Sequence, residues 1–258
     1  MARILLIETS ASTLSVALAQ DGVVLTDRIC REPRQQAALT APLVKEVLDA
    51  ASLKLSRCDA VAVSSGPGSY TGLRVGVSTA KGLCFGASLP LIAVGTLDIL
   101  VSGLCHSDCP LCHSDRHLCH SERPLCHSER PLCHSERSEE SPSFIVPMID
   151  ARRMEVYTAV YTPDGKRITP IEAKVVEPAS YDVYLSRGKV LFVGDGAMKC
   201  KGVIGHPNAV FQASEPLASN MAVLADAAFR AGRFEDVAYF EPFYLKDFVA
   251  TVSRKNLL

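Results

Sequence analysis

The sequence has no tryptophan, few aromatic residues and no excess of charge of either sign. Among its 258 residues, 27 lysines and arginines stand against 28 aspartates and glutamates, and the formal net charge is -1. Proteins that bind nucleic acid alone usually carry a basic excess, because much of their affinity comes from neutralising phosphates. The balanced charge therefore predicts that any contact with RNA depends on a partner protein.

Long apolar segments are also absent. No run reaches the roughly 20 residues that a membrane-spanning helix needs. Glu8 interrupts the apolar start of the chain, and no small-residue cleavage site of a signal peptide follows. We therefore expect a cytoplasmic protein with no membrane association, in which the 10 cysteines are reduced thiols.

Histidine is almost missing outside one repetitive segment. A seven-residue unit beginning Leu-Cys-His-Ser recurs from residue 104, and it holds six of the seven histidines and six of the 10 cysteines. Prolines in the unit exclude a coiled coil, since each would break the helix. Few large apolar side chains offset the entropy of ordering this chain, so residues 104–143 are predicted to be a disordered low-complexity insert.

A zinc-binding interaction module is the alternative interpretation of this segment, and it rests entirely on the repeat. Only two pairs, Cys109 with Cys112 and His113 with His117, have a spacing usual for zinc ligands. The adjacent Cys-His pairs do not space well around one tetrahedral ion. Outside the repeat the sequence keeps a single histidine, His206, and we predict no metal site there.

The remaining chain has the pattern of an α/β protein made of two similar halves. In the first half, strands and one long helix are predicted at 3–7, 14–19, 23–29, 35–51, 59–64 and 91–94. The second half partly repeats this order, at 144–149, 154–161, 189–193 and 216–231. The duplication predicts an actin/Hsp70-like ATPase (ASKHA, RNase H-like) fold, with two lobes of mixed sheet and helices on both faces. The expected division is a first lobe at 1–103, the insert at 104–143 and a second lobe at 144–258.

The most informative segment is SSGPGSYTGLRVG at residues 64–76, where a tight turn leads from a strand into a helix. Gly66 and Gly68 form the turn with the proline between them. Ser69 or Thr71 is expected to cap the helix by accepting hydrogen bonds from its first N–H groups. Such a helix start can hold an anion, but the segment lacks the Gly-Lys-Ser/Thr of a P-loop.

The helix that follows carries small residues at four-residue steps, at Gly72, Gly76 and Ala80. Each interior glycine costs about 1 kcal/mol relative to alanine, so the pattern needs a reason. Small residues on one helix face allow another backbone to approach closely. Two interpretations remain open: close packing on the protein's own sheet, or docking of a partner helix.

Catalytic groups are as scarce as histidine. The spacing of a nucleophile elbow fails around Ser69. Ser78 and Lys81 match the Ser-x-x-Lys pattern of some acyl-transfer enzymes, but the companion motifs are missing. Chemistry of the Ser-His-Asp kind would have to use His206 alone. No catalytic residue is therefore predicted.

The first turn, made of Glu8, Thr9 and Ser10, stands where actin-like ATPases place an acidic residue and a phosphate-binding turn. Such turns normally include a glycine, because the backbone must approach phosphate closely. Ala11 and Ser12 occupy the positions where that glycine is expected. The turn therefore indicates a degenerate phosphate site, with weak or no ATP binding and no cofactor.

Five motifs cover nearly the whole chain outside 104–143. They are ILLIETS from Ile4, SSGPGSYTGLRVG from Ser64, DARRMEVY from Asp150, VGDGA from Val193 and PFYLK from Pro242. In order and spacing they resemble the bacterial TsaB/YeaZ family, and the GPGSYTG segment is the most distinctive of them.

The resemblance implies a non-catalytic scaffold subunit of the machinery that makes N6-threonylcarbamoyladenosine (t6A) in tRNA. Its partners would be the homologous catalytic subunit TsaD and the ATPase TsaE. A homodimer is the assembly expected without TsaD, and tRNA would be bound only through the complex. In this family the first-lobe helices form the dimer surface, which carries over here to Leu39, Leu43, Gly72, Gly76 and Ala80.

The resemblance also bears on catalysis. The catalytic relative holds a metal through a His-x-x-x-His pair, which this chain outside the repeat cannot supply. The alternative function is an enzyme of the same superfamily, either a peptidase or an ATPase.

Overall fold

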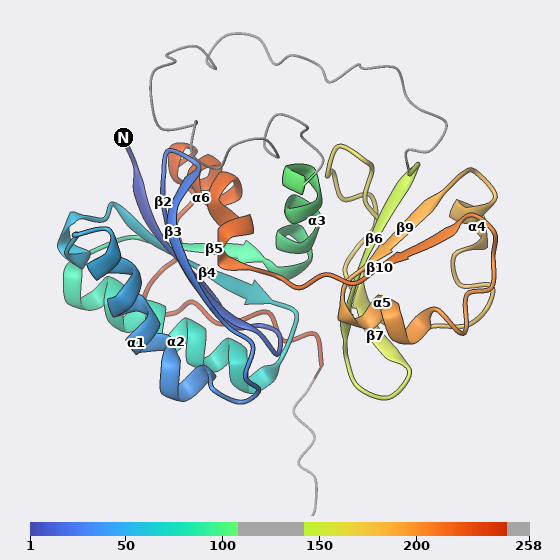
Figure 1. Ribbon diagram of the computed structural model, residues 1–258, viewed down its shortest axis with the longest axis horizontal. Coiled ribbons are helices and arrows are strands. Elements are labelled where there is room, and N and C mark those ends of the chain that lie inside the picture. Colours follow the sequence, from blue (N-terminus) through green and yellow to red (C-terminus); the bar gives the residue numbers. More distant parts are fainter. Residues whose placement is uncertain (108–141, 247–258) are drawn as a thin grey trace, which may run out of the picture.

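The computed structural model describes residues 1–107 and 142–246, and Figure 1 shows two lobes lying side by side. Most of the repetitive insert falls outside these residues. The predictions of its disorder and of a zinc-binding alternative therefore concern residues that the structure does not describe. Within the described ranges, no helix is long and apolar enough to cross a membrane.

The first lobe contains a five-stranded mixed sheet with two long helices on one face. The elements are β1 (Arg3–Glu8), β2 (Leu14–Gln20), β3 (Val23–Cys30), α1 (Gln36–Ala50), β4 (Ala60–Gly66), α2 (Tyr70–Ala87) and β5 (Leu91–Gly95). The strand order is β3-β2-β1-β4-β5, in which β1 to β3 are antiparallel and β4 and β5 run parallel to β1. Helices α1 and α2 lie next to each other under this sheet (Figure 1).

Apolar residues fill both faces of the first sheet, because helices cover it on two sides. Along β1, Leu5 and Ile7 pack toward α1 and α2, whereas Ile4 and Leu6 pack into the opposite layer. Successive side chains of a strand point to opposite faces, so a strand buried on both faces reads as a continuous apolar run. This accounts for the unbroken apolar run that ends at Glu8.

The second lobe repeats the first on a smaller scale. Its elements are β6 (Phe144–Asp150), β7 (Glu155–Thr158), β8 (Glu172–Val175), α4 (Asp182–Leu185), β9 (Val190–Val193), α5 (Asp195–Cys200) and β10 (Ala209–Gln212). The strand order β10-β9-β6-β7-β8 is the order of the first sheet read from the other edge. The antiparallel and parallel pairs also correspond. The predicted duplication of a mixed sheet is confirmed.

Three further elements join the lobes: α3 (Thr96–Ser107), a 3-10 turn η2 (Ala218–Met221) and α6 (Ala222–Arg230). Helix α6 follows the second-lobe strands in sequence but packs on the first sheet, where Met221 and Ala225 share a core with Ile4. Helix α3 packs against the second lobe through Leu100 and neighbouring residues. The division into 1–103, 104–143 and 144–258 therefore remains a proposal about the sequence, because α6 of the last segment packs on the first sheet.

Two polar contacts tie the lobes together near these elements. The hydroxyl of Tyr161, after β7, donates to Asp98 of α3 at 2.7 Å. Burial raises the pKa of Tyr161, so this hydroxyl keeps its proton. On the chain that returns to the first lobe, Glu215 accepts from the Thr13 hydroxyl at 2.5 Å and pairs with Arg31. Glu215 thus fixes the return path to the residue before β2 and to the residue after β3.

Candidate functional site

The turn that corresponds to a phosphate site is closed. Glu8, Thr9 and Ser10 are all completely buried. The N–H of Ser10 donates to the Glu8 carboxylate at 2.5 Å, and the N–H of Thr9 donates to the Ser64 hydroxyl at 3.4 Å. A phosphate would need these N–H groups free and open to the cleft. The residues present therefore do not fit the phosphate of a nucleotide.

The glycine-rich segment is what closes the turn. The N–H of Ser69 donates to the carbonyl of Ser10 at 2.7 Å. A Cβ on Gly68 or Gly72 would overlap the Ser10 or Thr9 carbonyl oxygen, and a Cβ on Gly76 would overlap the Thr9 hydroxyl oxygen. The loop and the first turns of α2 can therefore lie on the turn only because these positions lack side chains.

This contact decides between the two interpretations of the small residues on α2. Gly72 and Gly76 are buried against Thr9, and Ala80 is also fully buried in the first-lobe core. They allow close packing within the chain, and they do not face outward. The expectation that Gly72, Gly76 and Ala80 themselves contact a partner is corrected accordingly. Leu43 is likewise buried in this core, and Leu39 packs at its edge.

Among residues 1–107 and 142–246, the buried carboxyl of Glu8 has no basic side chain as a counterion. Burial raises its pKa to about 7, against the opposing effect of hydrogen bonds from Ser10 and Ser64. Its second oxygen, Oε2, has no hydrogen-bond partner among the described residues. A carboxyl in this state is largely neutral just below neutral pH.

The loop between β4 and α2 is fixed from both ends. Ser69 has an extended backbone and caps α2, its hydroxyl accepting from the N–H of Gly72 at 3.3 Å. Thr71, the other candidate cap, is exposed in the first turn of the helix. Gly66 has φ = 105°, and a side chain at that position would meet the carbonyl oxygen of Phe243.

The outward face of α1 and α2 carries small residues together with charged ones such as Lys45, Glu46 and Asp49. On α1 it includes Ala37, Ala38, Ala41 and Pro42, and on α2 it includes Arg74, Ser78, Gly82, Phe85 and Gly86. We call this set the α1–α2 face. Phe85 is the largest apolar group on it and is 85% exposed. It borders an apolar hollow of about 540 Å³ between α2 and residues 236–238.

The Ser78 and Lys81 pair does not form a catalytic site. Ser78 is exposed, whereas the Lys81 ammonium donates to the carbonyls of Ala238 and Phe240 at 3.0 and 3.1 Å. A lysine that acts as a base must be neutral and free to accept a proton. Lys81 instead holds a backbone segment in place.

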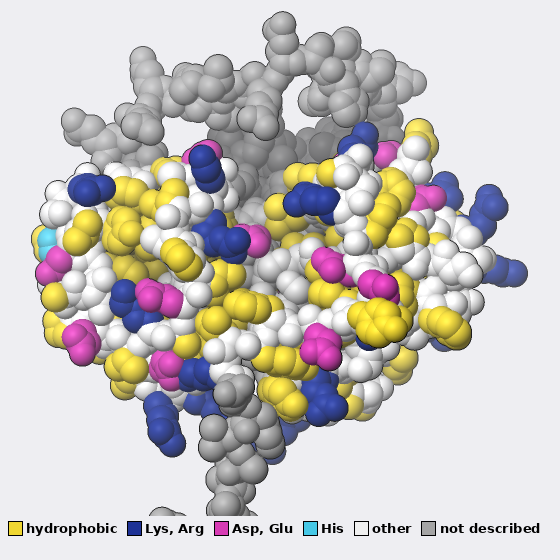
Figure 2. Space-filling model, turned by 180° about the vertical axis from the view of Figure 1, so that it is seen from behind, with side chains coloured by type: hydrophobic (Ala, Val, Ile, Leu, Met, Phe, Trp, Pro, Cys, Tyr) yellow, Lys and Arg dark blue, Asp and Glu magenta, His cyan; other side chains and the backbone are white. Residues whose placement is uncertain are grey.

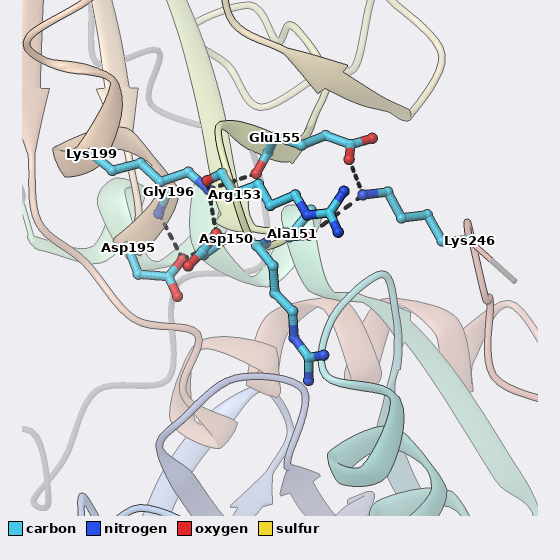
Figure 3. Close-up of polar contacts among 9 residues, drawn as sticks. Asp150, Ala151, Arg153, Glu155, Asp195, Gly196, Lys199 and Lys246 are labelled. Carbon is cyan, nitrogen blue, oxygen red and sulfur yellow. Dashed lines mark hydrogen bonds and ion pairs between the residues drawn. The ribbon is translucent and has the colours of Figure 1, made fainter. Parts of the chain in front are cut away.

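A second polar cluster lies on the second lobe, at the turn between β6 and β7 (Figure 3). Lys199 of α5 pairs with Asp150 and donates to the carbonyls of Arg153 and Glu155 at 2.9 and 2.6 Å. Asp195 accepts from the N–H of Asp150 at 3.0 Å, and burial raises its pKa. The cluster therefore fixes the turn through satisfied hydrogen bonds.

No role for this cluster was predicted from the sequence, although its residues lie in the motifs DARRMEVY and VGDGA. Asp150 ends β6, and Asp195 comes just after β9, a parallel neighbour of β6. The carboxyl ends of neighbouring parallel strands meet at one edge of a sheet, which is the signal that could have placed them together. Among the described residues, no group of three histidine, cysteine or acidic side chains could hold a metal ion.

The molecular surface shows no extended basic area on the side drawn in Figure 2. Lysine, arginine and acidic side chains alternate there with apolar ones across both lobes. An RNA backbone would find no continuous positive track on the described residues of this side.

Comparisons with known proteins give results consistent with one another. A sequence model of the TsaD family, described as tRNA N6-adenosine threonylcarbamoyltransferase, matches residues 32–113. The tRNA threonylcarbamoyladenosine biosynthesis protein TsaB of Escherichia coli K12 is 29% identical over 256 residues, which cover 96% of either chain. TsaB of Bacillus subtilis is 28% identical over 158 residues, covering 61% of this chain and 54% of that protein.

Solved structures give the same result. YeaZ from Pseudomonas aeruginosa superposes with a TM-score of 0.71 at 26% identity, covering 95% of this chain and all of that one. A second structure, described as similar to peptidase YEAZ from the same organism, has a TM-score of 0.74 at 26% identity. The motifs, the duplicated fold and the end-to-end alignment agree: along its whole length this chain is similar to proteins of the TsaB/YeaZ family.

Proposed function

We propose that this protein is a non-catalytic subunit of the complex that makes t6A in tRNA. In this role it binds and activates a TsaD-like catalytic subunit and works together with a TsaE-like ATPase. The similarity to E. coli TsaB, which is named for threonylcarbamoyladenosine biosynthesis and aligns along 96% of the chain, supports the pathway. It would act in the cytoplasm and meet tRNA only through the complex.

The closed turn is the observation that carries the non-catalytic role. The N–H groups of Thr9 and Ser10 already donate hydrogen bonds to Ser64 and Glu8, and the first turns of α2 pack directly on these residues. Opening the turn would require moving α2 off the first sheet, which would expose the core shared by Val77, Ala80 and Cys84. An ATPase or a phosphate-dependent enzyme cannot use such a site.

The α1–α2 face supports the choice of partner. The TsaD family model matches residues 32–113, a range that includes both helices. A TsaD-like subunit would therefore present a related helix pair, and two such pairs can pack as antiparallel helices with small residues at the contact. Ala41, Gly82 and Phe85 would lie at the centre of the interface on the α1–α2 face of this protein. A homodimer through the same face is the expected assembly without TsaD.

Binding to the TsaD-like subunit of the same organism tests this proposal. Wild-type protein is expected to bind in a calorimetric titration. Phe85→Glu should raise the dissociation constant about tenfold or more, because the loss of a buried aromatic side chain at the centre of an interface typically costs this much affinity. Val183→Glu on α4 is the matched control, because Val183 is also an exposed apolar residue but lies on the second lobe. A wild-type protein that does not bind would overturn the proposal.

The peptidase alternative can be checked in the same preparation. Ser78 and Lys81 do not form a nucleophile–base pair, since Lys81 is engaged by backbone carbonyls. Cleavage of a casein substrate that survives purification on a second column and disappears in Ser78→Ala would favour the peptidase function. We expect no cleavage.

A further inference from the structure

The segment after α6 takes a path that none of the motifs predicts. It leaves the layer of α6 and crosses the edge of the first sheet, where the N–H of Glu235 donates to the carbonyl of Leu91 at 2.8 Å. Val237 and Phe240 then pack into the core on the opposite face, beside α2. The chain has thus wrapped around strand β5 from one face of the sheet to the other.

The segment next follows α2 toward the glycine-rich loop. Lys81 holds the carbonyls of Ala238 and Phe240, as described above. The N–H of Phe243 donates to the carbonyl of Ser65 at 2.7 Å, and the ring of Tyr244 lies 4.9 Å from that of Tyr70. The segment therefore contacts both the helix of the α1–α2 face and the loop that closes the turn.

Its last described residues reach the second lobe. Lys246 pairs with Glu155 and donates to the carbonyl of Ala151 at 3.4 Å, and Leu245 packs against the core under α3. Figure 3 shows Lys246 approaching the β6–β7 turn from the side opposite Lys199. The turn is thus held by one lysine of its own lobe and one from this segment.

The turn itself needs such support. Arg152 and Arg153 follow one another with φ values of 69° and 53°, in the left-handed region that side chains other than glycine rarely adopt. Lys199 and Lys246 together bind the carbonyls of Ala151, Arg153 and Glu155 around them. Removing either lysine leaves part of this strained backbone without its partner.

The Lys246–Glu155 contact lies apart from the other connections between the two lobes. Helix α3 and the return through Ala218 both join the lobes on the α6 side of the first sheet. Links on one side of a sheet act as a hinge, about which the lobes can still rotate. Residues 237–244 run along α2 and its loop before Leu245 joins the α3 core, so the segment adds a separate connection between the lobes and resists their rotation.

We propose that residues 235–246 form a strap that latches the second lobe to the first, with the Lys246–Glu155 pair as the latch. The two side chains are partly exposed, so the pair is weak enough to open without unfolding either core. Opening it removes one of the two lysines that hold the β6–β7 turn and loosens the segment that contacts the loop at Ser65, because Lys246 and Phe243 lie on one segment. The strap thereby couples the second lobe to α2.

Amide hydrogen exchange on the full-length protein tests the latch. Lys246→Met should make the amides of 150–158 exchange roughly two- to fivefold faster, the range expected for a partly exposed ion pair. The amide of Phe243 should accelerate with them, while the denaturant midpoint stays close to that of wild type. Lys174→Met is the matched control, because it breaks the Lys174–Glu172 pair on the same sheet without touching the strap.

A charge exchange separates the latch from a general loss of stability. Lys246→Glu should accelerate exchange at 150–158, and adding Glu155→Lys to it should restore the wild-type rate. Hydrogen exchange of the isolated protein involves no partner. The latch can therefore be refuted while the proposed function stands, and the proposed function can be refuted while the latch stands. Unchanged exchange in Lys246→Met, acceleration of the whole chain at once, or no restoration by the charge exchange would each overturn the proposal.

Discussion

Gly76 of α2 lies directly on Thr9 of the first turn, so close that a methyl group on Gly76 would overlap the Thr9 hydroxyl oxygen. The contact joins residues far apart in sequence and explains two features at once. It accounts for glycine inside a helix, and it accounts for the loss of an accessible phosphate site. The same packing that stabilises the first lobe therefore removes the surface on which a nucleotide would bind.

Replacing this glycine tests the contact. Gly76→Ala should lower the free energy of unfolding by about 1–3 kcal/mol, because overpacking outweighs the better helix propensity of alanine. Gly82→Ala is the control on the same helix, since Gly82 is exposed and has no neighbour within 4 Å of an added Cβ. That substitution should stabilise by up to about 1 kcal/mol in urea unfolding. Equal effects at the two positions would contradict the packing argument.

Glu8 makes stability depend on pH. Its pKa is raised from 4.5 to about 7 in the folded protein by burial. The stability it contributes is therefore fully present below pH 4.5 and is lost as pH rises through about 7. The loss amounts to roughly 3 kcal/mol at alkaline pH.

Glu8→Gln removes this dependence, because the amide stays neutral. We expect wild type and variant to approach each other near pH 4.5, and the variant to gain on wild type steadily up to pH 8. Urea unfolding at several pH values measures the difference. Parallel pH profiles for the two proteins would show that Glu8 is not buried as described.

Lys199 should stabilise the second lobe more than its surface position suggests. It binds Asp150 and two backbone carbonyls of a turn in which Arg152 and Arg153 have positive φ angles. Lys199→Met should cost about 1–3 kcal/mol, since it removes three hydrogen bonds to the turn and leaves the Arg153 carbonyl without its ammonium donor. Lys201→Met, on an exposed lysine two residues along, should change stability by less than about 0.5 kcal/mol.

ATP should not stabilise the isolated protein. A ligand that binds only the folded state raises the melting temperature, and the rise grows with the logarithm of its concentration once this exceeds the dissociation constant. With the N–H groups of Thr9 and Ser10 already bonded, we expect no shift in a thermal melt with millimolar ATP and magnesium. A concentration-dependent shift that persists in Glu8→Gln would place a nucleotide elsewhere on the chain.

The sequence predicted the long elements well, because their patterns are long enough to be periodic. Helix α1 was expected at 35–51 and is observed at Gln36–Ala50, and the five strands of the first sheet were found. The short strands β8 and β10 and helices α4 and α5 were missed. Each has only four to six residues, and β8 and β10 lie at the sheet edges with half their side chains in solvent.

The site was harder to predict than the fold. Small residues at Gly72, Gly76 and Ala80 are equally suited to a partner helix and to an internal turn, so the pattern alone could not choose. The contact with Thr9 exists only after β1 and α2 come together across more than sixty residues of chain. The strap was missed for a related reason: residues 235–246 have no helical or strand period, and their contacts depend on the finished fold.

The central claim is that this protein promotes t6A formation without catalysing it. The most direct test measures t6A by nucleoside mass spectrometry in a mixture of TsaD, TsaE, threonylcarbamoyl-adenylate and unmodified tRNA, with or without this chain. We predict that product forms only when the chain is added, that Glu8→Gln supports it as well as wild type, and that Phe85→Glu does not. Equal product without the chain, or loss of product in Glu8→Gln while TsaD binding is retained, would contradict the account.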